Sequence, residues 1–370
     1  MEKLTDICDI QYGYAFDSAC FTEDSSYPPL VRIRDVKRGF SETYYSGEYP
    51  EEYVLHAGDL LVGMDGEFNI ARWKSIDALL NQRVCKLTAK EGTNEEYLRF
   101  AMVKALKTIE DKTAFVTVKH LSAKELNKLE LDIPCIEEQN LRADSLSKLE
   151  KIISLREEEL RQLDNLIKSR FVEMFGDINT NDKGWNTQPL GKLCTIVRGG
   201  SPRPIEKFLG GDVPWIKIGD ATDGESIYLH STKEHIIQEG VSKSRMVKAG
   251  SLIFANCGVS LGFARIITFD GCIHDGWLAM EDIDSRLDKI FLLQALNQMT
   301  EHFRKIAPAG TQPNLNTAIM KEYKQIIPPM QLQKEFVAFA TKTDKLKSEI
   351  QKSLDETQTL MDSLMQKYFG

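Results

Sequence analysis

Two long stretches of the chain carry apolar residues at alternating steps of three and four, the spacing of one helical face. In the first stretch these positions are Leu149, Ile153, Leu160, Leu163, Ile167 and Met174. In the second stretch they are Leu346, Ile350, Leu360 and Leu364. An average repeat of 3.5 residues packs one helix against another, so the pattern predicts two helices that pair as a coiled coil. The alternative for either stretch is an amphipathic helix lying on its own domain.

Short apolar runs precede each helical stretch and are bounded by Gly, Pro, Asn and Asp, which is typical of β-strands. Examples are LVRIRDV (30–36), DLLVGM (59–64) and VPWIKI (213–218). Alternation along the first run predicts that Arg32 and Arg34 lie on one face of a strand. We refer to the β-rich part before each helical stretch as a head.

The chain matches itself at a nearly constant shift. Its two Phe-Gly pairs end at Gly176 and Gly370, and 370 − 176 = 194. The same shift places DIPCIEEQ (132–139) on IIPPMQLQ (326–333). Further blocks align in the same order at shifts of 185 to 192: LTDICDIQYG (4–13) with LGKLCTIVRG (190–199), PLVRIRDV (29–36) with PWIKIGDA (214–221), and LHAGDLLVG (55–63) with VKAGSLIFA (247–255). Ordered blocks in one register indicate an internal duplication.

The predicted fold class is α+β, with two duplicated α/β domains that are each followed by a long helix. The two helices are expected to pair as an antiparallel coiled coil with pseudo-twofold symmetry. The predicted boundaries are 1–136 for the first domain, 137–177 for the central helix, 178–330 for the second domain and 331–370 for the C-terminal helix. Forty helical residues span ~60 Å, so the helices would hold two similar heads at a fixed spacing.

Composition narrows the class of protein without identifying it. No stretch approaches the ~20 apolar residues of a membrane helix, and the start MEKLTDICDI lacks the basic, then apolar pattern of a signal peptide. We therefore expect a cytoplasmic protein without a membrane partner. The seven cysteines are scattered and form no CxxC or Cys/His cluster, so no metal site is predicted. A net charge of −8 argues mildly against nucleic-acid binding but leaves room for a local basic face.

Two similar heads on a rigid spacer suit a long, regular ligand, and duplex DNA with half-sites at a fixed separation meets that description. Lys and Arg hold phosphates, Arg reads guanine, and Asn or Gln reads adenine. The candidate DNA-binding residues of the first head are Arg32, Arg34, Lys37, Arg38, Asn69, Arg72, Trp73 and Lys74. Those of the second head are Arg198, Arg203, Lys217, Asn256, Ser260, Arg265, Gln312 and Asn314.

Each of these groups also has a structural interpretation. The run containing Arg32 could be an edge strand protected by charge, with Lys37 and Arg38 in the loop that follows. The Gly-rich segments could be ordinary turns, and Asn314 could belong to a helix cap. The polar residues in LLNQRVCKL (79–87) and CIHDGWLAM (272–280) could serve either hydrogen-bonded structure or readout.

Motifs of several enzyme classes are absent from the sequence. It contains no GxxxxGK[ST] phosphate loop, GxSxG elbow or HExxH site, and no Asn/Asp-Pro-Pro-aromatic motif of an adenine methyltransferase. We therefore expect a chain that binds rather than catalyses, with no catalytic residue, no metal and no cofactor of its own.

The junction SRFVEMFGD to KGW (169–185), the run AGDLLVGMDGEFN (57–69) and the run LLNQRVCKL (79–87) resemble the DNA-specificity subunits of type I restriction-modification systems. The resemblance covers essentially the whole chain. It implies that each head is a target recognition domain for one half of a bipartite, asymmetric DNA sequence, and that the helices set the gap.

The resemblance also implies partners. Two modification subunits would form an adenine-N6 methyltransferase with this non-catalytic chain, and restriction subunits would add the endonuclease and translocase. S-adenosylmethionine, ATP and Mg would then be bound by those partners. Two alternatives remain: the specificity module of another DNA modification or defence system, and a duplicated coiled-coil scaffold whose heads bind protein.

Overall fold

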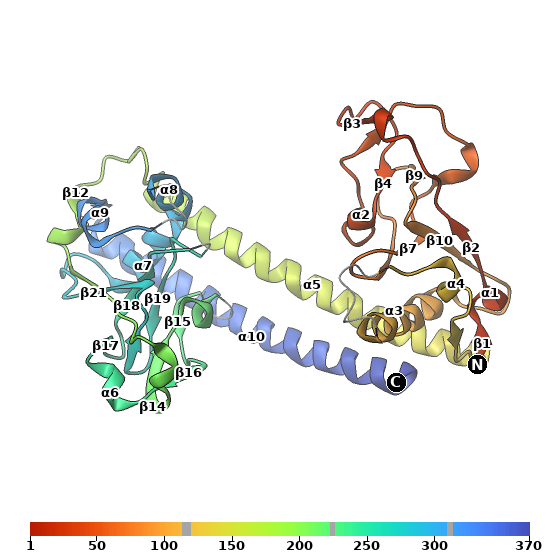
Figure 1. Ribbon diagram of the computed structural model, residues 1–370. Coiled ribbons are helices and arrows are strands. Elements are labelled where there is room, and N and C mark those ends of the chain that lie inside the picture. The colour runs from red at the N-terminus through yellow and green to blue at the C-terminus, as the bar shows by residue number, and fades with distance from the viewer. Residues whose placement is uncertain (113–119, 223–225, 259, 309–313) are drawn as a thin grey trace. The chain divides into compact units, whose positions relative to one another are not determined.

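The computed structural model describes residues 1–112, 120–222, 226–258, 260–308 and 314–370 (Figure 1). Internal contacts divide the chain into two compact units. Unit 1 contains Met1–Ser154 and Glu356–Gly370, and unit 2 contains Leu155–Asp355. Each long helix therefore contributes one end to each unit. Within the described residues, no helix has the length and apolar character needed to cross a membrane.

Unit 1 contains the first head. Its main sheet is antiparallel and has the order β2 (Cys8–Tyr12), β10 (Val84–Ala89), β7 (Leu60–Gly63) and β8 (Asn69–Arg72). A second sheet has the order β4 (Leu30–Val31), β9 (Ala78–Leu80) and β6 (Val54–Leu55). Two-stranded pairs are β1 (Glu2–Lys3) with β11 (Glu130–Leu131) and β3 (Phe21–Thr22) with β5 (Tyr44–Tyr45). The helices are α1 (Leu4–Ile7), α2 (Ile33–Arg38), α3 (Glu95–Lys112) and α4 (Ala123–Leu126).

Unit 2 contains the second head. Its larger sheet has the order β13 (Thr195–Arg198), β21 (Trp277–Glu281), β18 (Leu252–Ala255), β19 (Ala264–Ile267) and β15 (Tyr228–Leu229). A further sheet has the order β16 (Glu234–Ile236), β14 (Leu209–Ile216), β20 (Gly271–Ile273) and β17 (Arg245–Val247), and β12 (Thr187–Pro189) pairs with β22 (Lys324–Ile326). The helices are α6 (Gln238–Val241), α7 (Lys289–Gln298), α8 (Thr300–Ile306) and α9 (Thr317–Glu322).

The two heads repeat one connectivity, which confirms the predicted duplication. The order β2-β10-β7-β8 in unit 1 corresponds to β13-β21-β18-β19 in unit 2, and β4-β9-β6 corresponds to β14-β20-β17. Strand β7 maps onto β18 residue for residue at the shift of 192 found in the sequence, since 60 + 192 = 252.

The long helices are α5 (Ile136–Phe175) and α10 (Met330–Phe369), with 40 residues each. Their bounds differ by 194 at both ends. The start of each helix is fixed to its head by one buried glutamine. The Gln139 side-chain oxygen accepts from the Asn94 backbone N–H (2.8 Å), and its amide group donates to the carbonyls of Gly92 and Pro134 (3.1 and 2.9 Å).

In unit 2 Gln333 makes the same three bonds at the equivalent places. Its side-chain oxygen accepts from the Asp288 N–H (2.8 Å), and its amide donates to the carbonyls of Arg286 and Pro328 (2.8 and 2.7 Å). Both side chains are almost completely buried. A buried amide that satisfies three backbone groups holds the helix start at a single place and angle.

The ends of the two helices are held by aromatic packing. In unit 2 Phe175, at the end of α5, packs on Phe291 and Phe336 with ring centroids 4.9 and 5.6 Å apart. In unit 1 Phe369, at the end of α10, packs on Tyr97 at 5.2 Å. Tyr97 and Phe291 occupy equivalent positions in α3 and α7, since 97 + 194 = 291. The repeated Phe-Gly pair thus anchors a helix end in each unit.

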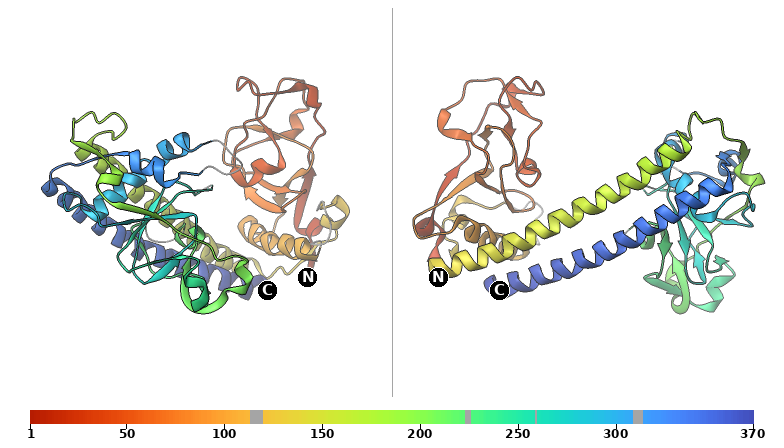
Figure 2. Two further views of the ribbon diagram at one scale, coloured as in Figure 1. Left: turned by 60° about the vertical axis from the view of Figure 1, so that its left-hand side comes forward. Right: turned by 180° about the vertical axis from the view of Figure 1, so that it is seen from behind.

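The contacts between α5 and α10 are antiparallel in both units, which confirms the predicted pairing (Figure 2). In unit 2 Asp164 of α5 pairs with Lys347 of α10. Phe171, seven residues later on α5, packs on Phe336, which lies eleven residues earlier on α10. In unit 1 Arg142, near the start of α5, donates to the Tyr368 carbonyl at the end of α10 (3.1 Å). Residues further along α5 therefore meet residues earlier in α10.

The predicted contact positions are partly wrong on α10. Leu346 and Leu360 are 46% and 49% exposed, whereas Thr343, Lys347 and Ile350 are buried. Polar contacts explain the difference, because Lys347 forms an ion pair with Asp164 and the buried Asp344 accepts from the Ser226 N–H (3.2 Å). The buried side of α10 is therefore partly polar, and it includes Ile350 of the predicted stripe but not Leu346 or Leu360.

The remaining predicted positions are all buried or partly buried. Ile167 is buried, and Met174 packs against the main core of unit 2. The partly buried positions are Leu149, Ile153, Leu160, Leu163 and Leu364.

The buried glutamines predict a local loss of stability. Gln139→Ala would leave the Asn94 N–H and two carbonyls without partners, at a cost of about 1–3 kcal/mol. We expect faster hydrogen exchange in the first turns of α5 and unchanged exchange in the first turns of α10, with Gln333→Ala giving the reverse. Gln162→Ala, which removes an exposed contact to Glu158, is the control. Exchange at the start of α5 equal to that of the control would contradict this role.

Candidate nucleic-acid interface

An open pocket of about 460 Å³ lies in the first head, beside the turn that joins β9 to β10. Its polar lining consists of Ser18, Arg32, Arg34, Asn81, Gln82 and Arg83. The apolar lining consists of Phe16, Phe21 and Ile33. Three guanidinium groups and two amides around one hollow suit phosphates and base edges.

The structure places the arginines on a different element from the strand that was predicted. β4 ends at Val31, and Arg32 precedes helix α2, so Arg34, Lys37 and Arg38 lie on that helix rather than on a strand and its loop. The buried Asp35 is the cause: its carboxylate accepts from the Arg32 backbone N–H (3.0 Å) and satisfies a free donor at the helix start. All four basic side chains are nevertheless exposed.

The contacts of these exposed side chains are few, and the ion pairs of Arg34 and Arg38 with the buried Asp35 are long, at 3.8 and 3.6 Å. Arg34 donates to the Thr43 hydroxyl (3.3 Å), and Lys37 lies 3.5 Å from the Glu67 carboxylate. Arg38 pairs with Glu42 (2.9 Å) and lies over the Phe40 ring. Ion pairs as exposed as that of Lys37 contribute little stability and exchange readily for a phosphate.

Two further candidates of the first head are part of its packing. Trp73 is 1% exposed and its indole N–H donates to the Ile76 carbonyl (2.7 Å), so it is a core residue. Asn69 is half-buried, and its amide donates to the Glu67 carbonyl (3.0 Å). Lys74 is exposed and remains available to a ligand.

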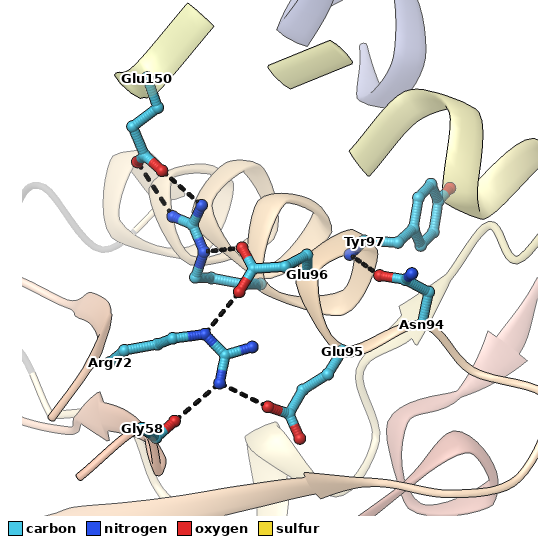
Figure 3. A network of polar contacts seen from close by, with 8 residues as sticks. Gly58, Arg72, Asn94, Glu95, Glu96, Tyr97 and Glu150 are labelled. Atoms are coloured by element: carbon cyan, nitrogen blue, oxygen red, sulfur yellow. Dashed lines mark hydrogen bonds and ion pairs between the residues drawn. The ribbon is translucent and has the colours of Figure 1, made fainter. Parts of the chain in front are cut away.

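Arg72 is held in a network that connects β8 to α3 and α5 (Figure 3). Its guanidinium donates to Glu95 (2.6 Å), Glu96 (2.5 Å) and the Gly58 carbonyl (2.7 Å). Glu96 also accepts from Arg99 (2.7 Å), which forms two bonds to Glu150 of α5 (3.1 and 2.6 Å). A cation shared by two carboxylates is not free for phosphate, so the predicted DNA contact of Arg72 is replaced by a structural role.

The electrostatics of this network favour the charged form of Glu96. Burial raises the pKa of Glu96, but hydrogen bonds and charge from Arg99 and Arg72 outweigh burial and hold it below its usual value of 4.5. In the same network, Asn94 caps α3 by accepting from the Tyr97 N–H (2.9 Å), so the start of the helix that carries both glutamates is fixed (Figure 3).

A second open pocket, of about 430 Å³, lies beside the equivalent turn of the second head, between β20 and β21. Its lining is Ser201, Pro202, Arg203, Pro204, Ile205, Glu206, Trp215 and His274. Arg203 is 80% exposed at its side chain and reaches 3.7 Å from Asp275. Arg198 is exposed and donates through Nε to the Asp275 carbonyl (3.0 Å). Lys217 is half-buried, pairs with Glu234 and lies 5.5 Å from the Trp215 ring.

The surroundings of His274 favour its neutral form. Burial lowers its pKa below the usual 6.5, and the cations Lys217, Arg203 and Arg198 lower it further against the opposing effect of Asp275. Its Nδ1 accepts from the Gly276 N–H (2.9 Å), which leaves the proton on Nε2, 2.9 Å from the Asp275 carboxylate. Although burial raises the pKa of Asp275, the Ser201 hydroxyl and nearby cations hold it below its usual value.

The other candidates of the second head are mostly internal. Asn256 is fully buried and donates to the Asn314 side chain and the Leu315 carbonyl (3.1 Å each), so both asparagines join the end of β18 to the segment before α9. The contacts of Asn256 give it a structural role within the second head. Arg265 is half-buried, and burial lowers its pKa to about 10. Ser260 is half-buried, and Gln312 lies outside the described residues.

The two pockets occupy equivalent places, and a pair of glycines positions both. A Cβ on Gly13 would lie 2.0 Å from the Asn81 carbonyl oxygen, and a Cβ on Gly199 would lie 2.1 Å from that of His274. Only glycine permits this approach of the chain to the turn. The sequence alone does not decide the role of the side chains in the two turns, although the matching glycines in QYG and VRG are a usable signal.

Comparison with known proteins gives one family over most of the chain. The model of the type I restriction modification DNA specificity domain matches residues 1–165 and 182–357. The chain is 44% identical over 138 residues to the type I restriction enzyme EcoBI specificity subunit of Escherichia coli, covering 37% of this chain and 29% of that protein. It is 22% identical over 187 residues to the MjaIX specificity subunit of Methanocaldococcus jannaschii, covering 49% and 43%. The matches thus span less than half the length of either relative.

Solved structures share the fold. The S subunit of a type I restriction-modification system from M. genitalium superposes with a TM-score of 0.63 at 16% identity, covering 100% of this chain and 95% of that chain. A chain from a structure on complex assembly and conformational transition of the type I R-M system gives 0.56 at 18% identity, covering 99% and 96%.

The Arg72 network predicts a pH-dependent contribution to the stability of unit 1. Because the pKa of Glu96 is lower in the folded chain, the contribution is present above pH 4.5 and is lost as the pH falls through the folded value. Glu96→Gln should lower the free energy of unfolding by about 1–2 kcal/mol at neutral pH. The difference from wild type should shrink on acidification below pH 4.5.

Urea unfolding of both proteins across this pH range, followed by Trp73 fluorescence in variants that lack the other tryptophans, measures the effect in unit 1. Glu48→Gln, at an exposed loop position, is the control. A difference between wild type and Glu96→Gln that does not change with pH would contradict the assignment.

Proposed function

Because this chain belongs to the type I restriction-modification DNA specificity family, we propose that it reads a bipartite, asymmetric DNA sequence, one half with each head. The observation that carries the proposal is the pair of pockets beside equivalent turns in the two heads. Equivalent placement suits two half-sites read in the same way, and the different linings suit two different half-site sequences.

The charge around the pockets supports DNA as the ligand. Arg32, Arg34 and Arg83 surround the first pocket, and Arg203 borders the second beside Arg198. These basic groups are local, since the chain as a whole has a net charge of −8. Phosphate contacts need basic residues only where the duplex lies, and the acidic remainder of the surface would disfavour binding elsewhere.

The long helices would set the gap between the half-sites. We propose recognition domains at 1–136 and 178–330, with spacer helices at 137–177 and 331–370. The glutamines that fix the helix starts and the phenylalanines that anchor their ends support such a spacer. A spacer can define a distance only if its attachment to each head is rigid.

The chemistry would belong to partner subunits in the cytoplasm. Two modification subunits would supply S-adenosylmethionine-dependent adenine-N6 methylation, and restriction subunits would supply ATP- and Mg-dependent cleavage. This chain would act as the non-catalytic component that selects the site and recruits both. Among the described residues there is no group of three or more His, Cys, Asp or Glu side chains arranged to hold a metal ion.

Methylome mapping tests the proposal directly. Co-expression with the modification subunits encoded beside it should methylate adenines in a two-part motif with a constant gap, detected by single-molecule sequencing of the host genome. Absence of methylation with all subunits present and assembled would overturn the proposal. A scaffold whose heads bind protein would also assemble with its partners, but it would give no motif.

The exposed arginines of the first pocket should contribute phosphate contacts. Arg32→Ala combined with Arg34→Ala should weaken DNA binding about tenfold or more and reduce the slope of log K against log salt by about 2, because two counterion-releasing contacts are lost. Fluorescence anisotropy with the mapped duplex over a series of salt concentrations measures both.

The matched control removes two arginines from α5, the exposed Arg161 and the half-buried Arg170, by Arg161→Ala with Arg170→Ala. Assembly with the modification subunits should be unchanged in the pocket variant. An unchanged slope and affinity in that variant would remove Arg32 and Arg34 from the interface.

A further inference from the structure

The turn between β9 and β10 in the first head is held from both sides by backbone hydrogen bonds. On one side the Gly13 N–H donates to the Val84 carbonyl, and the Tyr14 N–H donates to the Leu80 carbonyl (3.0 Å each). On the other side the Met64 N–H donates to the Arg83 carbonyl (2.9 Å). The turn itself is closed by the Val84 N–H donating to the Asn81 carbonyl (3.2 Å).

The turn between β20 and β21 in the second head is held by the equivalent bonds. The Gly199 N–H donates to the Trp277 carbonyl (2.9 Å), and the Gly200 N–H donates to the Ile273 carbonyl (3.0 Å). The Asn256 N–H donates to the Gly276 carbonyl (2.9 Å), and the Trp277 N–H closes the turn on the His274 carbonyl (3.0 Å).

The side chains on this common scaffold differ completely. The first head places Asn81, Gln82 and Arg83 in the turn, and the second head places His274, Asp275 and Gly276 there. The paired hydrogen bonds agree in length to within 0.2 Å, although the three turn residues all differ. The hydrogen bonds are thus a structural requirement, while the turn side chains are variable. Side chains free to differ on a rigid support can determine specificity.

The backbone of Arg83 is strained at this position. Its φ is +71°, in the left-handed region that non-glycine residues rarely occupy. Its side chain is 51% exposed, and Nη1 lies 3.0 Å from the His120 ring and 3.5 Å from the Asp65 carboxylate. Nη1 is therefore held on one side, which orients the guanidinium plane while Nε and Nη2 remain available for a ligand.

We propose that the β9–β10 turn is the base-reading element of the first half-site and that Arg83 recognises a guanine in it. The proposal rests on the function proposed above and deepens it by naming the side chain and base. An oriented guanidinium offers two parallel donors that match the O6 and N7 acceptors of guanine in the major groove. The adjacent Gln82 is exposed in the same turn and would border this contact.

The left-handed backbone supplies a variant that separates readout from folding. Arg83→Gly removes the side chain and suits φ of +71° better than arginine does, so the turn should keep or gain stability. The equivalent residue of the second head is Gly276, whose φ lies outside the left-handed region, so the strain is specific to Arg83. Arg83→Lys keeps the charge but cannot make the two parallel bonds.

The experiment is methylome mapping of wild type, Arg83→Gly and Arg83→Lys, each co-expressed with the modification subunits. Both variants should relax one position in one half-site, that position should be a G·C pair in the wild-type motif, and the other half-site and the gap should be unchanged. Affinity for the wild-type duplex should fall by about 5- to 150-fold in Arg83→Gly.

The control is Lys90→Ala, which removes a positive charge beside the opposite end of strand β10 and should leave the motif unchanged. Unchanged motifs and affinity in Arg83→Gly, or relaxation at a position that is not G·C, would overturn the assignment of Arg83 to guanine. Absence of any two-part motif in the wild type would instead count against the proposed function, so the two failures are distinguishable.

Discussion

The architecture depends on how rigidly each long helix is joined to a head. One buried glutamine at the fourth position of each helix satisfies a backbone N–H and two carbonyls that would otherwise be unpaired in the interior. Leaving such groups unpaired is costly, so the helix cannot change its starting angle without losing all three bonds. A long helix transmits position only when its ends are fixed, and the repeated phenylalanine fixes the far ends by packing on Phe291 and Tyr97.

In both heads the same backbone hydrogen bonds hold the turn, while the turn side chains, which form its rim, differ (81–83 and 274–276). Glycines at positions 13 and 199 let one strand end approach the neighbouring turn so closely that any side chain would collide with a carbonyl oxygen. The turn is then held by backbone bonds alone, which do not depend on the identity of its side chains. This arrangement lets the rim change while the fold is preserved, a useful property in a family whose members distinguish DNA sequences.

The duplication and the helices could be predicted because they rest on local and periodic signals. The repeat at a shift of 194 led to predicted helices at 137–177 and 331–370, within two residues of the observed Ile136–Phe175 and Met330–Phe369, since a repeated pattern records the same structural demands twice. The helix start at Arg32 and Arg34 could not be predicted from the alternation of apolar and polar residues. A buried aspartate three residues after Arg32 stabilises a helix start, and this outweighs the strand pattern of LVRIRDV.

By itself the sequence determined the duplication into two heads, the two paired helices and the basic and amide residues that the heads carry. The tertiary structure alone decided which candidate side chains are exposed and which are held inside the fold. Arg72 and Arg32 look alike in the sequence, but Arg72 is held by Glu95 and Glu96, which come from a helix more than twenty residues away, whereas Arg32 lines a pocket. The physical reason is that periodicity in the sequence indicates the helix or strand to which a residue belongs. Whether its charge is available depends on the partners that other helices and strands bring to it.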